Sequence, residues 1–222
     1  MRTLYHLWLS PFCRAVRVVL GEKKLEFQMQ TENIWDRREE FLAVNPAGEV
    51  PVLIDIDGNA ISGCEVICEY LEESYTDMPL LPKSAIARAE ARRLVYWFNT
   101  KFNAEVTENL LGEKMMKRFL GLGEPDAAAI RAGYRNLRTH LEYIAYLVER
   151  RNWIVGDELS YADIVAAAHL SSLDYIGEMP WEDHDTVKTW YSRIKSRPSF
   201  RTLLGDHIPG SPPPNHYANL DF

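Results

Sequence analysis

A serine stands at the expected start of the first helix, a position where a hydroxyl can act on a negatively charged ligand. Residues 10–13 have the sequence Ser-Pro-Phe-Cys and follow a short apolar segment. The backbone amides at a helix N-terminus stabilise negative charge. Ser10 is therefore either a plain helix cap or a hydrogen-bond donor to a bound thiolate. Because serine replaces the first, reactive sulfur of a Cys-Pro-x-Cys motif, disulfide exchange through Cys13 alone is disfavoured.

A second candidate segment places a proline at the start of an expected strand. Residues 45–53 have the sequence Asn-Pro-Ala-Gly-Glu-Val-Pro-Val-Leu. Proline lacks the N–H that a sheet ladder uses, so Pro51 fits where the strand edge is open or where the Val50–Pro51 peptide is cis. A Val50 backbone presented in this way can pair with an extended peptide.

Short apolar strands alternate with helical patterns over the first 80 residues, which is typical of an α/β layer. The patterns predict strands at residues 4–8, 26–31, 52–56 and 60–62, and helices at residues 11–23, 36–43 and 65–75. The Asp57-Gly58 pair predicts a tight turn between the last two strands. Ser10 then lies between the first strand and the first helix, and Pro51 opens the third strand.

The chain changes character after the Pro-Leu-Leu-Pro segment at residues 79–82, which is a linker by composition. Ser84 predicts the N-cap of a long helix, and further helices are expected at residues 126–150, 161–173 and 186–196. Ser160 and Asp163 predict a capping box at the start of the helix at residues 161–173. Helical spacing predicts that the following side chains of the first two helices face inward: Ile86, Leu94, Trp97, Phe98, Phe102, Val106, Leu110, Ile130, Tyr134, Leu137, Leu141, Ile144 and Val148.

Charge and composition exclude several classes of function. The chain carries 25 basic and 32 acidic residues, and residues 1–80 hold 7 of the basic and 14 of the acidic ones. A surface of this sign repels nucleic acid and anionic membranes. No apolar run approaches the roughly 20 residues that insertion into a membrane needs, and no signal-peptide pattern opens the chain, so we expect a cytoplasmic protein.

Cysteine and histidine usage gives no sign of a metal site or a disulfide framework. Cys13, Cys64 and Cys68 are too few for such a framework and lack the paired spacing of a zinc site. The six histidines show no metal-ligand spacing either.

Five segments together resemble the soluble glutathione transferases: residues 10–17, 45–53, 67–71 (Ile-Cys-Glu-Tyr-Leu), 156–163 (Gly-Asp-Glu-Leu-Ser-Tyr-Ala-Asp) and 197–200 (Arg-Pro-Ser-Phe). The resemblance implies a thioredoxin-like domain over residues 1–80 with the glutathione site, and an all-helical domain over residues 84–208 that lines the acceptor pocket. It also implies a homodimer. Ser10 would be the thiolate-activating hydroxyl, and the Val50–Pro51 peptide would clamp the cysteinyl unit of glutathione.

The sequence departs from the family where the charges of glutathione are recognised. The acidic residue and the serine that hold the γ-glutamyl group in the family correspond to Gly63 and Cys64, and a lysine or glutamine is replaced by Glu49. Glycine offers no countercharge, and a thiol is a weak donor. Losing two charge-assisted contacts of about 1.5–3 kcal/mol each weakens binding by roughly two to four decades. Glu65, one position further on, is an alternative partner for the ammonium group.

Residues 209–222 are expected to form an extended, proline-rich tail. Its end, Pro-Pro-Pro-Asn-His-Tyr-Ala-Asn-Leu-Asp-Phe, resembles transferase-fold division factors of alphaproteobacteria that bind the tubulin-like protein FtsZ. A short apolar and acidic motif after a stiff proline run suits docking; the alternative is a packed or disordered end. The candidate partner-binding residues are Tyr217, Leu220, Asp221, Phe222 and Trp35, the last in a strand–helix connection where exposure and packing are equally expected.

These observations lead to two main functional hypotheses and leave open whether the chain is an enzyme. The first is a binding factor with a degraded glutathione site that modulates FtsZ filament assembly in the bacterial cytoplasm, at the division site. The alternative is a bacterial glutathione transferase that conjugates glutathione to small electrophiles through Ser10. A third, glutathione-linked thiol transfer through Cys13, is less favoured. No tightly bound cofactor is expected, and glutathione is at most a weak ligand or a cosubstrate.

Overall fold

The computed structural model describes residues 1–220, and its α/β part carries both candidate segments. Four strands form a mixed sheet in the order β2-β1-β3-β4. They are β1 (Arg2–His6), β2 (Phe27–Thr31), β3 (Val52–Ile54) and β4 (Ala60–Ser62). β1 is parallel to β2, and β3 is antiparallel to both β1 and β4. The helix α1 (Pro11–Glu22) makes the crossover that the parallel pair requires.

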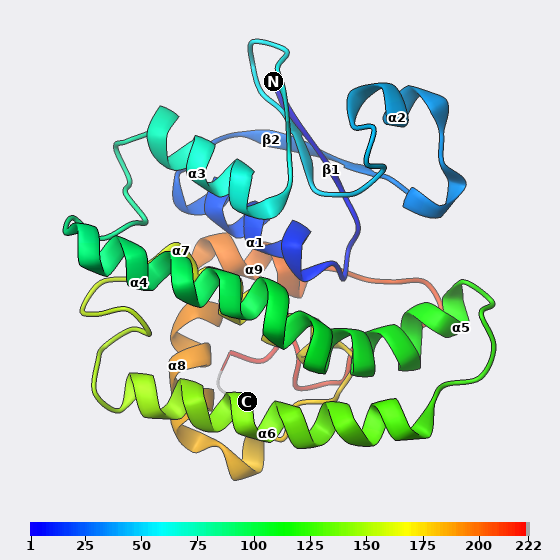
Figure 1. Cartoon of the computed structure of the whole chain (residues 1–222), viewed down its shortest axis with the longest axis vertical. Coiled ribbons are helices and arrows are strands. Elements are labelled where there is room, and N and C mark those ends of the chain that lie inside the picture. The colour runs from blue at the N-terminus through cyan, green and yellow to red at the C-terminus, as the bar shows by residue number, and fades with distance from the viewer. Residues whose placement is uncertain (221–222) are drawn as a thin grey trace.

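Successive side chains of β1 point to opposite faces of the sheet, and side chains of other elements pack on both faces. Leu4 is fully buried in the core, on the face that α1 and α3 (Cys64–Ser74) cover (Figure 1). The next residue, Tyr5, points to the opposite face, where its ring lies 5.3 Å from that of Phe41 in α2 (Glu39–Val44). A single turn of 3-10 helix, η1 (Ile34–Asp36), precedes α2. The alternation is that of a strand covered on both faces.

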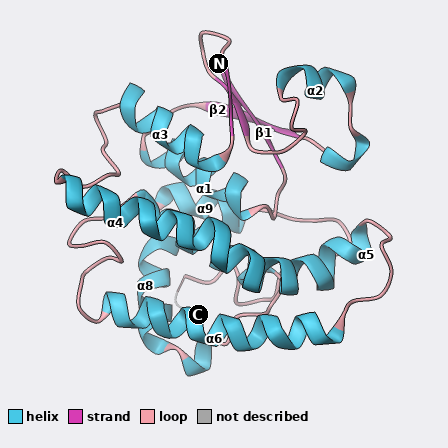
Figure 2. Cartoon of the chain, in the orientation of Figure 1, coloured by secondary structure: helices cyan, strands magenta, loops and turns pink. Residues whose placement is uncertain are grey.

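The remaining regular elements of the described chain are helices, joined by loops, as Figure 2 shows. The segments α4 (Ala85–Tyr96), η2 (Trp97–Met116, with wider π-helical turns) and α5 (Lys117–Phe119) form one continuous rod, and α6 (Ala127–Val148) runs back beside it. The others are α7 (Tyr161–Tyr175), η3 (Trp181–Asp183), α8 (Asp185–Lys195) and α9 (Pro198–Leu204). Within residues 1–220 no helix is both long and apolar enough to span a bilayer.

The predicted fold class, an α/β unit followed by an all-helical unit, is confirmed. Most predicted element ends agree to within two residues, but α2 begins three residues after its predicted start, and α9 was not predicted. Both predicted caps are present: the Ser84 hydroxyl accepts the Ala87 amide at 3.2 Å, and Ser160 and Asp163 form a capping box. The buried Asp163 carboxylate also accepts from Ile154 N and Trp190 Nε1, at 2.9 and 3.0 Å. This carboxylate therefore joins the start of α7 to α8.

Two of the side chains predicted to face inward are exposed. Ile86 is 81% exposed, because α4 begins at the surface and its buried positions start only at Ala91. Tyr134 is 37% exposed, and its hydroxyl lies in a polar surface cluster with Lys114 and Glu178. Helical spacing identifies a face of the helix but not where along the helix the packing begins.

Helix α1 connects the two parts of the chain because it packs against α7 and α9 as well as against α3 of the α/β part. Near its end, Gly21 lies so close to α9 that a Cβ there would meet the Ser199 Cβ at 2.9 Å. Beside it, the Glu22 carboxylate accepts from Arg197 Nε and Nη2 at 2.6 and 2.7 Å, and from the Ser199 hydroxyl. Burial raises the pKa of Glu22, but these hydrogen bonds outweigh it and hold the pKa below its ordinary value.

We predict that Glu22→Gln lowers the free energy of unfolding near neutral pH by about 1–3 kcal/mol, because it weakens a charge-assisted contact between α1 and α9. A carboxyl with a depressed pKa in the folded state stabilises above its unfolded pKa and loses this effect as acid protonates it. The difference between variant and wild type should therefore shrink on acidification, as measured by urea unfolding at several pH values. Glu149→Gln, in an exposed pair with Arg150, is the control. A difference that stays constant with pH would contradict the assignment.

Candidate functional site

Ser10 caps α1 and lines a cavity at the same time. Its Oγ accepts the Cys13 amide at 3.3 Å, and Pro11 occupies the first helical position. The cap interpretation is thus confirmed. The half-buried hydroxyl nevertheless faces the cavity at the N-terminus of α1, where backbone amides favour an anion. The two roles proposed for Ser10 are compatible in this geometry.

The Val50–Pro51 peptide is cis, and Val50 and Pro51 both line the cavity. β3 pairs with a strand on each side, so the alternative of an open strand edge is wrong. The loop that precedes β3 is held by Asn45, which is only 6% exposed. Its Nδ2 donates to the Glu49 carbonyl at 2.8 Å. The motif therefore fixes the backbone that it presents to the cavity.

The N-terminus of α3 has no side-chain cap. Gly63 precedes it with φ at +91°, a conformation that favours glycine. Cys64 follows and is 5% exposed. A hydrogen bond with Cys68, together with burial, raises the pKa of the Cys64 thiol well above its ordinary value. This position accordingly offers a neutral thiol to the cavity.

Cys13 lies inside the protein with no exposed surface. Burial raises the pKa of its thiol to about 12, although hydrogen bonds with Ser10 and Leu7 act in the opposite direction. A thiol with such a pKa is a poor nucleophile because the thiolate is the reactive form. This geometry argues against thiol transfer through Cys13.

Glu65 is oriented by residues that sequence reasoning missed. Asn99 of η2 donates from Nδ2 to Glu65 Oε1 at 3.1 Å. The Asn99 Oδ1 faces His169 Nε2 at 3.2 Å, and His169 Nδ1 faces the Thr107 hydroxyl at 3.1 Å. Burial lowers the pKa of His169 to about 3, so the ring is neutral: Nε2 donates to Asn99 and Nδ1 accepts from Thr107. No spacing in the sequence indicates this chain of hydrogen bonds.

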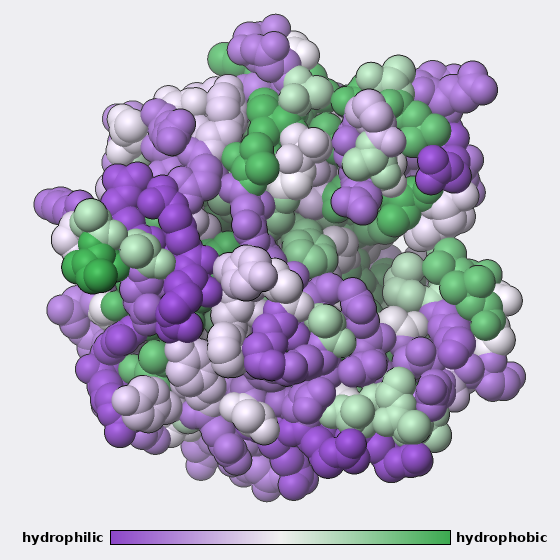
Figure 3. Space-filling view, viewed as in Figure 1, coloured by the Kyte–Doolittle hydropathy of each residue, from purple (hydrophilic) through white to green (hydrophobic). Residues whose placement is uncertain are grey.

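These elements enclose a cavity of about 1060 Å³ between the α/β layer and the long helical rod. Figure 3 shows it as a hollow with apolar residues around it, between the α2 region and α5. Its walls include aromatic side chains and the methionines of η2, and its carboxylates are Glu49, Glu65 and Glu108. Of the described residues that line the cavity, none is lysine, arginine or histidine. An anionic ligand meets no countercharge from the lining side chains.

Trp35 lies half-buried at the cavity and contacts the other part of the chain. Its ring centroid is 5.4 Å from that of Phe119, the last residue of α5, which is 60% exposed. Both expectations for Trp35 hold in part, because its ring packs against Phe119 and also lines the cavity.

The expected extended tail instead folds back onto the helices. Tyr217 has no exposed surface, so its assignment as a partner-binding residue is wrong. Its hydroxyl accepts from Arg14 Nη1 at 2.9 Å and donates to the Leu203 carbonyl at 3.1 Å. Leu220 is half-buried. Asp221 and Phe222, also predicted to bind a partner, lie outside the described residues.

Arg14 and Arg17 explain why the tail packs inward. Both guanidinium groups are buried and share the Asp206 carboxylate, with N–O distances of 3.2 and 2.8 Å. One carboxylate cannot satisfy all the donors of two guanidinium groups. Arg14 therefore uses the Tyr217 hydroxyl and also donates from Nε to the Trp8 carbonyl at 2.8 Å. The same side chain thus holds both the tail and the loop that carries Ser10.

Comparison with known proteins agrees with this geometry. Residues 9–74 match the family described as glutathione S-transferase, N-terminal domain, and residues 123–205 match its C-terminal domain. The chain belongs to the glutathione transferase family. Within the family, FtsZ-localized protein A of Caulobacter vibrioides is 47% identical over all of this chain and 98% of its own length. A crystal structure of a glutathione S-transferase from Rhodospirillum rubrum F11 is 56% identical, covers both chains completely and superposes with a TM-score of 0.98.

A more distant member was crystallised with a glutathione derivative. The transferase from Methylobacterium radiotolerans, in complex with glutathione sulfonate, is 27% identical, with a TM-score of 0.77 over 93% of this chain and 97% of its own. Glutathione carries two carboxylates and one ammonium group besides its thiol. Ser10 and the Val50–Pro51 peptide, which the family resemblance assigns to the sulfur end, both line the cavity. The two carboxylates of glutathione meet no basic side chain among the described residues that line the cavity, whereas its ammonium group has carboxylates nearby.

We predict that Tyr217→Phe lowers the free energy of unfolding by about 1–3 kcal/mol, because it removes the buried hydroxyl that accepts from Arg14 Nη1 and donates to the Leu203 carbonyl. Arg14 Nη1 then keeps the carbonyl and the hydroxyl of Ser171 as acceptors. Chemical denaturation followed by tryptophan fluorescence measures the change. Tyr146→Phe is the matched control, since Tyr146 is 53% exposed. Equal stabilities of the two variants would show that the tail does not anchor in this cluster.

Proposed function

We propose that this chain is a transferase-fold binding factor for the tubulin-like division protein FtsZ, and that it modulates FtsZ filament assembly. The observation that carries the proposal is the 47% identity to FtsZ-localized protein A along the whole chain, tail included. In this proposal the protein acts as a homodimer in the bacterial cytoplasm, at the division site.

The character of the cavity supports a binding role over conjugation of glutathione. The fold keeps the features that hold a sulfur, namely Ser10 at the α1 N-terminus and the cis Val50–Pro51 peptide. The described residues that line it include no basic side chain for the two carboxylates of the tripeptide. Such charge-assisted contacts would supply affinity for glutathione as a cosubstrate.

The proposed partner surface combines Trp35 with the end of the tail. Trp35 and Phe119 form an aromatic pair at the cavity, and aromatic side chains are frequent anchors in protein interfaces. A second cavity, of about 540 Å³, shares Met115 and Phe119 with the first and is lined by the proline run of the tail. Because Tyr217 is fixed in the core, the described part of the tail is already ordered, which reduces the entropy lost on docking.

Co-sedimentation with polymerised FtsZ from Caulobacter vibrioides tests the proposal. We expect the wild type to pellet with the filaments, and expect Trp35→Ala and a deletion of residues 220–222 each to weaken binding by about tenfold or more, as for interface anchors. Tyr146→Ala, a change at an exposed aromatic residue on α6, is the control and should bind as the wild type does. Failure of the wild type to pellet would contradict the proposal. A longer deletion is unsuitable, because removing Tyr217 disturbs the core.

The alternative function, conjugation of glutathione to small electrophiles through Ser10, is favoured by the sulfur end of the site and by the relatives crystallised with glutathione or its sulfonate. A conjugation assay with an aryl halide separates the two functions. We expect the wild type to give no rate above the uncatalysed reaction. A wild-type rate that Ser10→Ala lowers by about a hundredfold, a typical loss when a group that stabilises the reacting anion is removed, would favour the alternative.

A further inference from the structure

The outer face of α6 carries three arginines in a row. Arg131, Arg135 and Arg138 are all exposed, and spacings of four and three residues put their side chains on one face of the helix. The opposite face packs closely on η2, since a Cβ on Gly133 would meet Leu110 side-chain atoms at 2.9 Å. In Figure 1 the helical rod lies between α6 and the α/β layer. We call the three arginines the arginine row of α6.

The arginine row has no acidic partner among the described residues. Exposed arginines elsewhere are paired, as Arg92 is with Glu69 at 2.8 Å. Within residues 1–220, no ion pair joins the row to a carboxylate, not even to Glu142, which lies one turn beyond Arg138. Like charges at these spacings slightly destabilise a helix. The stability of α6 therefore does not account for the row.

The charge of the row is opposite to that of the chain as a whole, which carries 25 basic and 32 acidic residues. A nucleic acid or an anionic membrane extends well beyond the row and meets the negative charge of the rest of the surface. A short acidic segment meets the row alone, because charges further away than about 8 Å are largely screened at physiological ionic strength. The charge pattern favours a short acidic polypeptide over the larger polyanions.

The length of the row matches a short extended peptide. Seven residues separate Arg131 from Arg138, which is about 10 Å along a helix that rises 1.5 Å per residue. Three residues of an extended chain, at about 3.4 Å each, cover the same length. A guanidinium group can donate two parallel hydrogen bonds to one carboxylate. Carboxylates of an extended acidic segment can therefore reach all three arginines.

An aromatic side chain lies beside the row on a rigid support. Tyr134 is 37% exposed, and its hydroxyl accepts from Lys114 Nζ at 2.6 Å and donates to the Glu178 carboxylate. These contacts fix the Tyr134 ring, so little entropy is lost when a partner packs on it. Arginine and tyrosine are both enriched in protein interfaces. The composition of this face is that of an interface.

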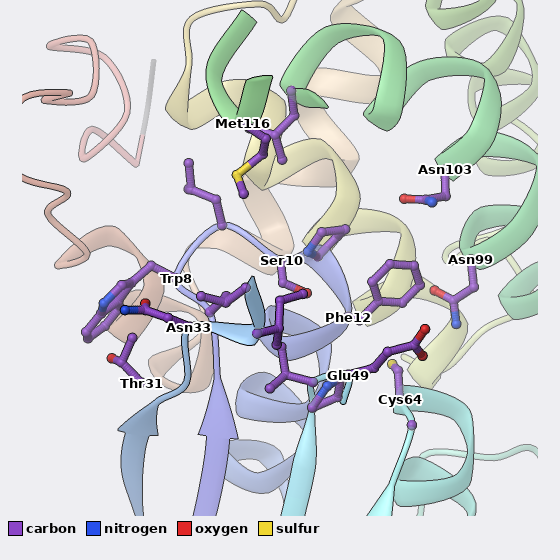
Figure 4. A pocket seen from close by; sticks show the side chains of 18 of the residues that line it. Trp8, Ser10, Phe12, Thr31, Asn33, Glu49, Cys64, Asn99, Asn103 and Met116 are labelled. Atoms are coloured by element: carbon purple, nitrogen blue, oxygen red, sulfur yellow. The ribbon is translucent and has the colours of Figure 1, made fainter. Parts of the chain in front are cut away.

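The arginine row is separate from both cavities. Figure 4 shows the large cavity, whose labelled side chains come from the α/β layer and from η2. Among the described residues, none that lines the large or the second cavity belongs to α6. The row is therefore not part of the surface formed by Trp35 and the tail.

We propose that the arginine row of α6 docks a short acidic segment of another protein. Arg131, Arg135 and Arg138 form ion pairs with carboxylates of that segment, and Tyr134 packs against it. The proposal goes beyond the binding of FtsZ through Trp35 and the tail, and it does not depend on that binding.

Fluorescence anisotropy with matched probes tests the proposal on the full chain. Hexaglutamate and hexaserine, each labelled with fluorescein, differ in charge but not in backbone length. We expect saturable binding of hexaglutamate, at least about tenfold tighter than that of hexaserine. Raising the salt concentration from about 50 to about 300 mM should weaken it, because salt screens exposed charges. Absence of saturable hexaglutamate binding, or equal binding of both peptides, would overturn the proposal.

A labelled hexathymidylate distinguishes a polypeptide site from a nucleic-acid site. We expect it to bind more weakly than hexaglutamate, for the reason of charge given above. Tighter binding of the oligonucleotide would refute docking of an acidic polypeptide as the role of the row.

A triple variant locates the binding on α6. Arg131→Gln, Arg135→Gln and Arg138→Gln together should weaken hexaglutamate binding by about tenfold or more, as the loss of three exposed ion pairs implies. All three side chains are exposed, and a thermal melt checks that the variant is folded. Unchanged binding by the folded triple variant would contradict the assignment.

A second triple variant controls for net charge. Lys24→Gln, Lys83→Gln and Arg201→Gln remove the same number of charges from three exposed positions outside α6, and this variant should bind hexaglutamate as the wild type does. If both triple variants weaken binding equally, the attraction comes from the overall charge and the proposal fails. Sedimentation velocity of the α6 variant should match the wild type. A changed oligomeric state would show that the row joins copies of this chain instead.

Discussion

The buried pairing of Arg14 and Arg17 with Asp206 is the interaction on which the arrangement of the site depends. The two arginines belong to α1, Asp206 follows α9, and the Tyr217 hydroxyl of the tail completes the cluster. A buried charge left without its partner is strongly destabilising. The pairing therefore fixes α1 against the helical part of the chain. Since Arg14 also holds the Trp8 carbonyl, it fixes the loop that presents Ser10.

The shape of the cavity between the two parts follows from the family fold, whereas its charge is set by the acidic side chains that line it. The capped α1 N-terminus and the cis Val50–Pro51 peptide are present where the family resemblance assigns sulfur binding. Glu49 and Glu65 give the adjoining region a charge that repels carboxylates. A fold can retain its architecture while its site changes, because packing in the core and the charges of the cavity depend on different residues. This separation is consistent with a transferase fold that serves as a binding factor.

Features that depend on residues close together in the chain, such as helix caps, could be predicted from the sequence. The Ser84 cap and the Ser160–Asp163 capping box depend on residues a few positions apart, and both were predictable. The burial of Tyr217 was not, because its partner Arg14 is 203 positions away in the chain. The orientation of Glu65 was missed for the same reason, since Asn99 and His169 come from two other helices. Candidate residues of the site were found from motifs, whereas the contacts that orient them depend on tertiary packing.

The central proposal is that the chain keeps the transferase fold but binds glutathione weakly at most. Titration calorimetry of glutathione into the purified protein tests it most directly. The charges that line the cavity predict a dissociation constant weaker than about 1 mM, as expected when charge-assisted contacts are missing. Saturable binding in the micromolar range would contradict the account. It would require positive charges opposite the two carboxylates of glutathione, and the described lining residues supply none.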